Sequence, residues 1–235
     1  MSRPIPGPQK LTPEILVRAY AAGVFPMSEG RNDPGIFWVD PQLRGIIPLE
    51  HLHLSKSMRK ILRKDLFQVT ANTCFERVIH ECAVPRPEQN TQGNRVHETW
   101  INDEIIRACI EMNHLGLAHS VEVWQDEELV GGLYGIHLKG AFMGESMFSR
   151  TANASKVALA HLVARLRIGG FQLLDTQFIT EHLCTMGGIE ISGQDYQERL
   201  IQALEIDAQF PASPPEDVLG SEFVRMFSQS SNQIS

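Results

Sequence analysis

The sequence predicts an α/β fold with a mixed, largely antiparallel sheet flanked by helices. Residues 119–124, 129–137 and 140–148 have the composition of strands and are separated by short turns, which is typical of consecutive antiparallel strands. A long helical pattern over 155–168 follows, and a further strand is predicted over 171–177. Antiparallel strands followed by a helix and another strand indicate a sheet of mixed direction.

Caps and apolar spacing predict the remaining elements. Thr12 can cap a helix that begins at Pro13, a residue that suits the first turn, and Gly23 can end it. Apolar residues recur at helical spacing from Asn102 until Gly116. Further helices are predicted over 55–64, 75–83, 180–186 and 192–208, and a short strand over 67–70.

Three segments are rich in turn-forming residues. Residues 24–48 combine Gly, Pro and aromatic residues, which favours an irregular subdomain with a binding surface over a linker. Residues 84–98 contain two Pro, one Gly and four Asn or Gln and are predicted to form a loop. After Phe210 the chain becomes rich in Pro, Ser, Gln and Asn, so residues 209–235 are expected to form a loosely ordered tail.

The overall composition is that of a soluble globular protein. Of the 235 residues, 43% are apolar and 21% are charged, which excludes a largely disordered chain. No apolar run has the length of a membrane-spanning helix, and the first residues lack the apolar stretch of a signal peptide. The 4 cysteines form no CxxC pair and no dense framework. We therefore expect a cytoplasmic protein with free thiols and no membrane partner.

The charge is unevenly distributed along the chain. The formal net charge is −7, which counts against a nucleic-acid partner. The run 55–64, however, contains no acid, and Arg44 lies just upstream. Such a run forms either a solvated helix face or a local surface that binds a phosphate backbone. Its five cations are Lys56, Arg59, Lys60, Arg63 and Lys64.

Acidic side chains occur inside two otherwise apolar strands. Alternation places Asp175 and Gln177 on one face of their strand. In the preceding strand it places Glu145 with Met143 and Met147, and places Phe142, Gly144, Ser146 and Phe148 on the opposite face. Burial of an unpaired acid costs several kcal/mol. The acids therefore form either a functional cluster in a pocket with apolar walls or an exposed strand edge.

Other candidate sites are weaker. His51 and His53 could supply two metal ligands, but no third ligand lies at a suitable spacing, so no metal site is predicted. His119 and Ser120 lack the Gly-x-Ser-x-Gly turn of a serine hydrolase. Gly131-Gly132 and Gly187-Gly188 do not match a phosphate-binding loop of the P-loop or Rossmann type.

Eight short motifs occur in one order along the chain: Ala21–Pro26, Phe37-Trp38 with Asp40-Pro41 and Arg44-Gly45, Glu98–Ile101, Ala118–Trp124, Leu129–Gly135, Gly144–Arg150, Asn153–Lys156 and Leu174–Gln177. Together they resemble the leucyl/phenylalanyl-tRNA–protein transferase family over residues 11–204. Chance similarity is implausible for eight motifs in the right order.

The resemblance implies an aminoacyltransferase. Such enzymes move Leu or Phe, with Met as a third candidate, from aminoacyl-tRNA to the α-amine of proteins that begin with Lys or Arg, which marks those proteins for degradation. It also implies a small N-terminal subdomain (1–53) and an acyltransferase domain like that of the GNAT superfamily (54–208), followed by the tail (209–235). An aminoacyl ester is already activated, so no cofactor is expected. We expect a monomer.

By the same resemblance, three polar residues form the catalytic set. Gln177 accepts a hydrogen bond from the attacking amine, Asp175 polarises or orients that amine, and Glu145 pairs with the cationic acceptor. An amide is a feeble base, so the group that removes the amine proton stays open.

The resemblance also implies three binding regions. The side chain of the transferred amino acid would occupy a pocket lined by Leu133, Phe142, Met147, Leu166 and Leu174. Trp38 and Trp100 correspond to aromatic residues that hold the terminal adenosine of the tRNA, and the run 55–64 would bind phosphates of the acceptor stem. This chain departs from many family members at Met27, where they have Trp.

Two other functions are alternatives to the transferase. An acyltransferase that uses acyl-coenzyme A would bind pyrophosphate through an Arg/Gln-x-x-Gly-x-Gly/Ala loop, and Arg150–Ser155 does not have that pattern. A non-catalytic protein that binds tRNA ends or protein N-termini would keep its binding when the catalytic set is changed.

Overall fold

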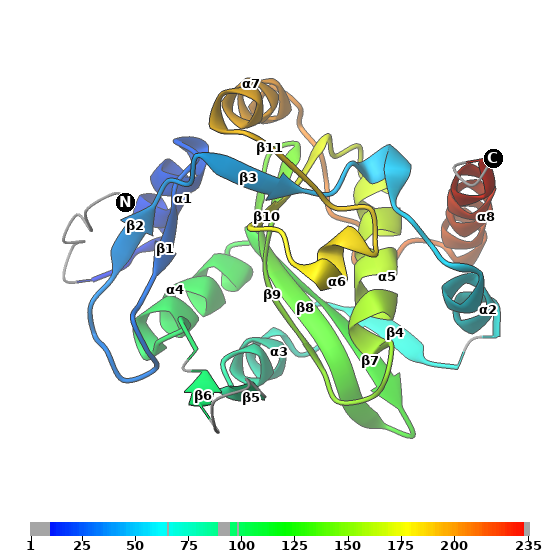
Figure 1. Cartoon of the computed structure of the whole chain (residues 1–235), viewed down its shortest axis with the longest axis horizontal. Helices are drawn as coiled ribbons and strands as arrows, with labels where there is room; N and C mark the ends of the chain where they lie inside the picture. Colours follow the sequence, from blue (N-terminus) through cyan, green and yellow to red (C-terminus); the bar gives the residue numbers. More distant parts are fainter. Residues whose placement is uncertain (1–9, 65, 89–94, 98, 233–235) are drawn as a thin grey trace.

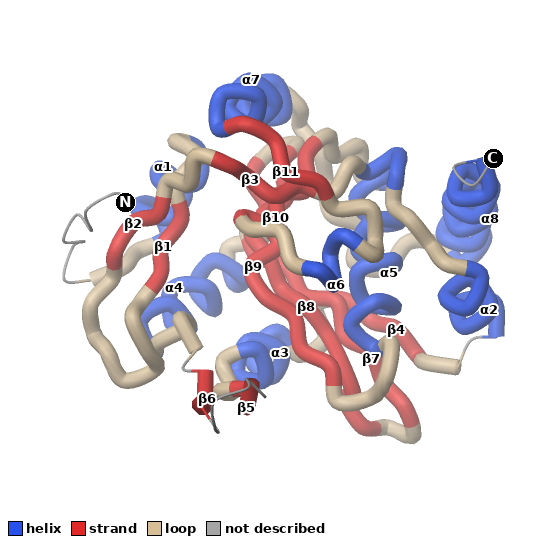
Figure 2. The backbone as a smooth tube through the Cα atoms, viewed as in Figure 1, coloured by secondary structure: helices blue, strands red, loops and turns tan. Residues whose placement is uncertain are grey.

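A seven-stranded mixed sheet lies at the centre of the protein (Figures 1 and 2). The computed structural model describes residues 10–64, 66–88, 95–97 and 99–232. Strands β9 and β10 are parallel and the other neighbours in this sheet are antiparallel, which confirms the predicted mixed sheet. The order across the sheet is β11 (Ile189–Ser192), β3 (Leu43–Ile46), β10 (Leu173–Gln177), β9 (Ala141–Ser149), β8 (Glu128–Leu138), β7 (Ala118–Gln125) and β4 (Gln68–Ala71).

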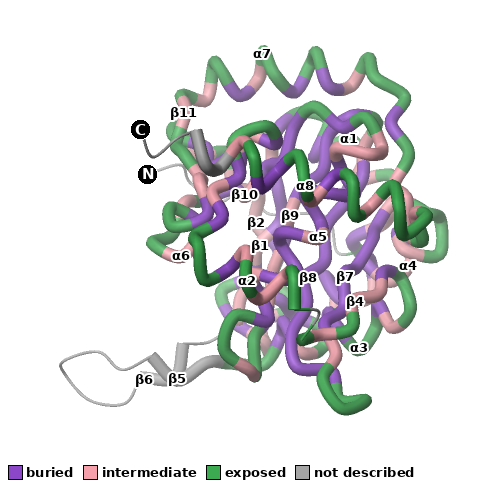
Figure 3. Tube along the Cα trace, turned by 90° about the vertical axis from the view of Figure 1, so that its right-hand side faces the viewer, coloured by how far each residue is buried: buried purple, intermediate pink, exposed green. Residues whose placement is uncertain are grey.

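Helices cover both faces of the sheet and enclose two apolar cores. One core receives side chains from α1 (Pro13–Ala21), α3 (Phe75–Cys82), α4 (Asp103–His114) and α7 (Gly193–Leu204). The other core is built around α5 (Ala154–Ile168), with α2 (Lys56–Lys64) and α6 (Glu181–Cys184) beside it. Figure 3 shows that α5 and the central strands are buried, as a helix that is apolar on nearly every side must be.

The predicted helices are present, with ends that differ by a few residues. Some short strands differ from the prediction. The predicted loop contains a short antiparallel hairpin, β5 (Arg86–Glu88) with β6 (Arg95–His97), and β11 was not predicted. Strands of three or four residues at a sheet edge or outside the sheet bury too little to give an alternating pattern. The predicted loop positions 89–94 and 98, the first nine residues and the last three lie outside the described residues.

The C-terminal segment differs from the loosely ordered tail that its composition predicts. Residues Glu216–Asn232 form helix α8, which packs on α5 at the right of Figure 1. Its Met226 and Phe227 are buried, and Glu222 forms an ion pair with Arg167 at 2.6 Å. Polar Ser and Gln residues lie between the apolar positions of this segment, so its helical spacing is hard to recognise in the sequence. The helix is stable only because it packs against α5.

The N-terminal segment contains a small separate sheet, in which β1 (Phe25–Met27) pairs with β2 (Phe37–Val39), and a 3₁₀ turn, η1 (Leu49–His51). It also supplies β3, which lies between β10 and β11 of the large sheet although it precedes residue 53. The predicted domain boundaries at 53/54 and 208/209 stay a prediction.

A β-bulge at Glu145 overturns the predicted alternation in β9. Tyr134 faces Ser146 across the ladder and Gly135 faces Gly144, so Glu145 is the extra residue. Met143 consequently packs in one core while Met147 packs against the other, whereas the sequence placed both on one face. A Cβ atom at position 135 would collide with the Met143 carbonyl oxygen, so the bulge requires glycine there.

A buried pair of histidines predicts acid sensitivity. His119 Nε2 lies 3.3 Å from His137 Nδ1, and the His119 ring stacks on Phe210 at 4.2 Å. Burial, and then the neighbouring His137, lower the pKa of His119 to about 3. Unfolded His119 binds a proton below its ordinary pKa of about 6.5 and the folded residue does not, so stability falls as the pH falls through 6.5 toward 3.

His119→Gln should remove this pH dependence. We expect the wild type to lose about 2 kcal/mol of unfolding free energy through this residue between pH 7 and pH 5, because the unfolded state alone gains the proton. Urea unfolding of both proteins at the two pH values measures the difference, with His114→Gln as control because His114 is exposed. An equal pH dependence in wild type and H119Q would contradict the prediction.

None of the described helices combines the length and hydropathy that a membrane span requires.

Candidate active site

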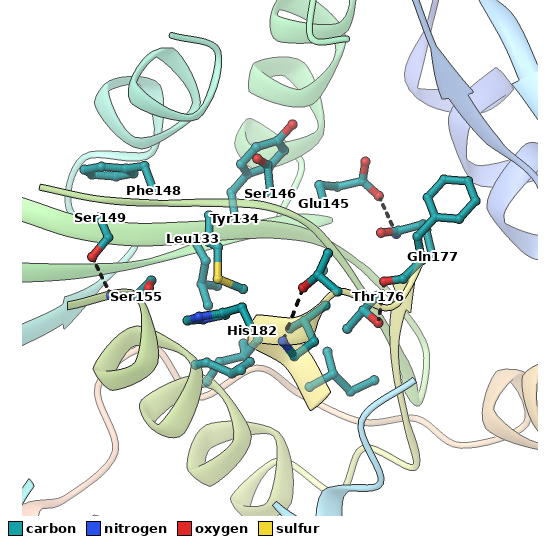
Figure 4. Close-up of a pocket in the computed structure, with 18 of the residues that line it drawn as sticks. Leu133, Tyr134, Glu145, Ser146, Phe148, Ser149, Ser155, Thr176, Gln177 and His182 are labelled. Carbon is teal, nitrogen blue, oxygen red and sulfur yellow. Dashed lines mark hydrogen bonds between the residues drawn. The ribbon is translucent and has the colours of Figure 1, made fainter. Parts of the chain in front are cut away.

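A cavity of about 610 Å³ opens beside the bulged strand (Figure 4). Strands β8, β9 and β10 form one side of it, α5 and α6 a second, and β1 a third. Most of its wall is apolar. The apolar residues that line it are Phe25, Met27, Trp100, Leu133, Met147, Phe148, Leu159, Leu162, Leu174, Phe178 and Leu183.

Glu145 and Gln177 belong to the polar part of the wall, which also includes Ser, Thr and His side chains, and they point toward one another in Figure 4. Gln177 Nε2 donates a hydrogen bond to Glu145 Oε1 at 3.3 Å. Burial raises the pKa of Glu145 to about 8, although a hydrogen bond from Tyr20 acts in the opposite direction. The bulge changes the direction of the Glu145 side chain, because the extra residue of a bulge is turned out of the regular alternation.

Asp175 lies behind this wall and does not line the cavity. It is fully buried, and both carboxylate oxygens accept hydrogen bonds from Arg44, at 2.9 and 2.6 Å. Tyr196 donates to the same carboxylate at 3.0 Å, and the backbone N–H of Gln177 donates to it at 2.8 Å. The structure therefore brings Asp175 into contact with the backbone of Gln177.

Arg44 was not predicted as part of this site. The sequence placed it beside the basic run, but its side chain is buried and belongs to the Asp175 cluster. Its inclusion in the Arg44-Gly45 motif was the one signal that separated it from the surface cations.

Only some residues of the predicted donor pocket line the cavity. Leu133, Met147 and Leu174 line it, while Phe142 and Leu166 are fully buried in the adjacent core. Sequence reasoning missed Leu159, Leu162 and Leu183, which come from α5 and α6. The apolar spacing of α5 predicts burial but does not tell a cavity wall from a packed core.

Of the two predicted tryptophans, only one lines the cavity. Trp100 lines the cavity. Trp38 lies on β2 in register with Pro26 of β1, and it packs against the first core. Met27, the position where many family members have Trp, lines the cavity from the same small sheet.

The five cations of the basic run lie on α2, which is next to α8 (Figure 1) and contributes no residue to the cavity wall. Lys56, Lys60 and Lys64 are exposed. Arg59 donates to the Phe227 carbonyl oxygen at 3.3 Å, and the Arg63 guanidinium lies 4.8 Å from the centre of the Phe227 ring. The structure thus gives two of the five cations contacts with α8.

The described residues contain no group of three or more His, Cys, Asp or Glu side chains that could hold a metal ion. What the cavity can do chemically is set by its two kinds of wall. Leucine and methionine side chains can hold an apolar group, and Glu145 and Gln177 offer oxygen atoms to an amine or a cation.

Known proteins of one family match most of this chain. The family profile described as leucyl/phenylalanyl-tRNA protein transferase matches residues 46–201, and that of its N-terminal domain matches residues 9–42. A Rhodospirillum rubrum protein named leucyl/phenylalanyl-tRNA–protein transferase is 54% identical over 211 residues, which cover 90% of this chain and 95% of that protein. Proteins of the same name from Paramagnetospirillum magneticum (56%, covering 85% and 92%) and Maricaulis maris (52%, covering 93% and 97%) are similarly related.

These matches confirm the resemblance and the expectation of a transferase enzyme. The chain belongs to the leucyl/phenylalanyl-tRNA–protein transferase family.

Proposed function

We propose that this protein transfers Leu or Phe, with Met as a third donor, from aminoacyl-tRNA to the α-amine of proteins that begin with Lys or Arg. The product would be marked for degradation in the cytoplasm. The observation that supports this most is the contact between Glu145 and Gln177 on the wall of a mainly apolar cavity. One cavity thereby offers an apolar wall to the donor side chain and a carboxyl group to a cationic acceptor.

The reaction needs orientation more than activation. The α-amine attacks the carbonyl carbon of the aminoacyl ester, a new C–N bond forms, and the C–O bond to the ribose breaks with the electron pair and finally a proton going to the ribose oxygen. Gln177 accepts a hydrogen bond from the amine, and Glu145 pairs with the acceptor's cation. Pairing with a carboxylate attracts Lys or Arg and disfavours acidic N-termini.

The apolar wall fits the donor side chain. Leu133, Met147 and Leu174, with the α5 leucines, can enclose a Leu, Met or Phe side chain. A pocket of this kind discriminates by about 1–3 kcal/mol for each misfitting group. Trp100, which lines the cavity, would stack on the terminal adenine, and stacking on an aromatic ring contributes about 1–3 kcal/mol for each base.

A transfer assay tests the proposal. Purified protein is mixed with tRNA charged with radiolabelled leucine and with matched peptides that begin with Arg or with Asp. We expect label to pass to the Arg peptide alone. Transfer from acyl-coenzyme A instead would favour the small-molecule acyltransferase, and binding of charged tRNA with no transfer would favour a non-catalytic binding protein.

The exposed lysines of α2 should bind tRNA phosphates. The double variant Lys60→Gln with Lys64→Gln is expected to weaken tRNA binding. The negative slope of the logarithm of the binding constant against the logarithm of the salt concentration should become less steep, by about 0.7–0.9 for each lost phosphate contact. Binding measured by filter retention at several salt concentrations gives the slope. The control is Lys139→Gln, another exposed lysine, on the β8–β9 turn. An unchanged slope in the double variant would show that α2 does not contact the tRNA backbone.

A further inference from the structure

We infer that Arg44 is a positioning residue of this active site: it holds Asp175 so that the carboxylate fixes the backbone turn at Gln177 and with it the Gln177 side chain. The inference rests on the proposed function, because the orientation of Gln177 has a kinetic consequence only if Gln177 receives the attacking amine. It assigns Asp175 a task different from direct contact with the amine.

The guanidinium of Arg44 is held on all sides. Its Nε and Nη2 donate to the two oxygens of Asp175, and Nη1 donates to the Gly23 carbonyl oxygen at 2.8 Å. The rings of Phe25 and Tyr196 lie 4.7 and 4.2 Å from its central carbon. A planar two-bond pair between aromatic rings fixes direction as well as charge, which a lysine cannot reproduce.

The Asp175 carboxylate accepts a hydrogen bond from a backbone segment of unusual conformation. Gln177 has a φ of 56°, in the left-handed region that costs a non-glycine residue about 1–2 kcal/mol. The pairing of β10 with β3 shifts by one residue here, since Asp175 faces Ile46 and Gln177 faces Gly45. Asp175 Oδ1 accepts the Gln177 N–H at 2.8 Å, and this bond offsets part of the conformational cost.

The same turn determines where the amide of Gln177 lies. The backbone of β3 approaches it so closely that a Cβ atom on Gly45 would lie 2.7 Å from the Phe178 carbonyl carbon. From this position the Gln177 side chain reaches Glu145 across the cavity wall. A chain of direct contacts therefore runs from Arg44 through Asp175 to Gln177, although Arg44 does not line the cavity.

Arg44→Lys tests the inference because it keeps the charge and removes the two-bond geometry. We expect kcat for transfer to fall by about 100-fold, the loss typical of an approximately 1 Å misplacement, with little change in the KM for charged tRNA. Arg44→Ala should lower kcat further. Added guanidinium should restore part of the kcat of this variant, with a saturable dependence on guanidinium concentration, whereas ammonium should not.

The matched control is Arg167→Lys. Arg167 is also a largely buried arginine in an ion pair, with Glu222 at 2.6 Å, but it joins α5 to α8 and does not line the cavity. We expect this variant to lower the melting temperature without reducing kcat. If Arg44→Ala does not fold, Arg44→Lys and its control still give the comparison.

A wild-type kcat in R44K would overturn the inference, whether its melting temperature is lowered, its KM is raised or neither changes. A lowered melting temperature would make Arg44 a structural residue, and a raised KM would make it a binding residue. If the wild-type protein itself transfers no label, the proposed function fails and the kinetic role of Arg44 fails with it. Normal wild-type transfer beside a normal R44K variant refutes the inference alone.

Discussion

Asp175→Asn is expected to reduce the rate of transfer by about 10²–10³-fold while charged tRNA still binds. The substitution keeps the shape of the side chain but removes its charge, and one of the two atoms that face Arg44 becomes a donor. The Gln177 turn then loses a charge-assisted hydrogen bond, and a shift of Gln177 by about 1 Å is enough for a loss of this size. Single-turnover transfer with saturating charged tRNA measures it.

The same variant should also be less stable. Removing one partner of a buried ion pair typically costs about 3–5 kcal/mol, because the charge of Arg44 stays buried without its partner. Urea unfolding measures this cost. The control is Asp207→Asn, an equally conservative change in the exposed pair with Lys139, where an effect below about 1 kcal/mol is expected. A full transfer rate in a destabilised D175N protein would show that Asp175 has a structural role only.

Glu145→Gln is expected to abolish the preference for cationic N-termini. Truncating one member of a desolvated charge pair costs about 2–5 kcal/mol in binding, so the KM for an Arg peptide should rise by roughly 30-fold or more. The KM for charged tRNA should change little, because the apolar wall stays intact. Steady-state kinetics with Arg and neutral Ala peptides measure the ratio. An unchanged Arg preference in E145Q would place acceptor recognition elsewhere.

The pKa of Glu145 adds a pH dependence with a definite sign. Burial raises it from 4.5 to about 8, so between these values the folded protein holds a proton that the unfolded chain has lost. Wild-type stability should therefore fall with rising pH across this window, by up to about 1.4 kcal/mol per pH unit from this group. E145Q lacks the group.

The unfolding free energy of E145Q relative to wild type should therefore increase from pH 5 to pH 8 and level off above it. At neutral pH the free protein carries the proton on Glu145, so binding of a cationic acceptor should release it. Urea unfolding across this range tests the stability difference, and a difference that does not vary with pH would mean that Glu145 ionises normally in the folded protein.

The fold was largely predictable because most elements follow local rules. The cap at Thr12, the turn residues between strands and the apolar spacing of α5 each act over a few residues. The tail was not predictable from its composition, since α8 owes its stability to the surface of α5. The residues that form the hairpin of β5 and β6 show no alternation of apolar and polar residues in the sequence.

The site was predictable in its residues more than in its geometry. Alternation pointed to Asp175 and Gln177 as unusual, but it assumes an unbroken pleat, and both β9 and β10 are irregular at their functional residues. The partner of Asp175 could not be inferred from spacing, because Arg44 lies 131 positions away in the sequence. Buried ion pairs of this kind are a property of the assembled sheet.

The position of β3 has a consequence for synthesis on the ribosome. This strand lies between β10 and β11, so its neighbours do not exist when it leaves the ribosome. At about 5–20 residues per second, the 131 positions between Arg44 and Asp175 take on the order of 10 s to translate. During that interval a nascent chain has an incomplete sheet with an open edge, which makes late, non-local closure the slow part of folding. The Asp175 cluster thus forms only once Tyr196 has been made, and no product truncated before Asp175 should be able to transfer an amino acid.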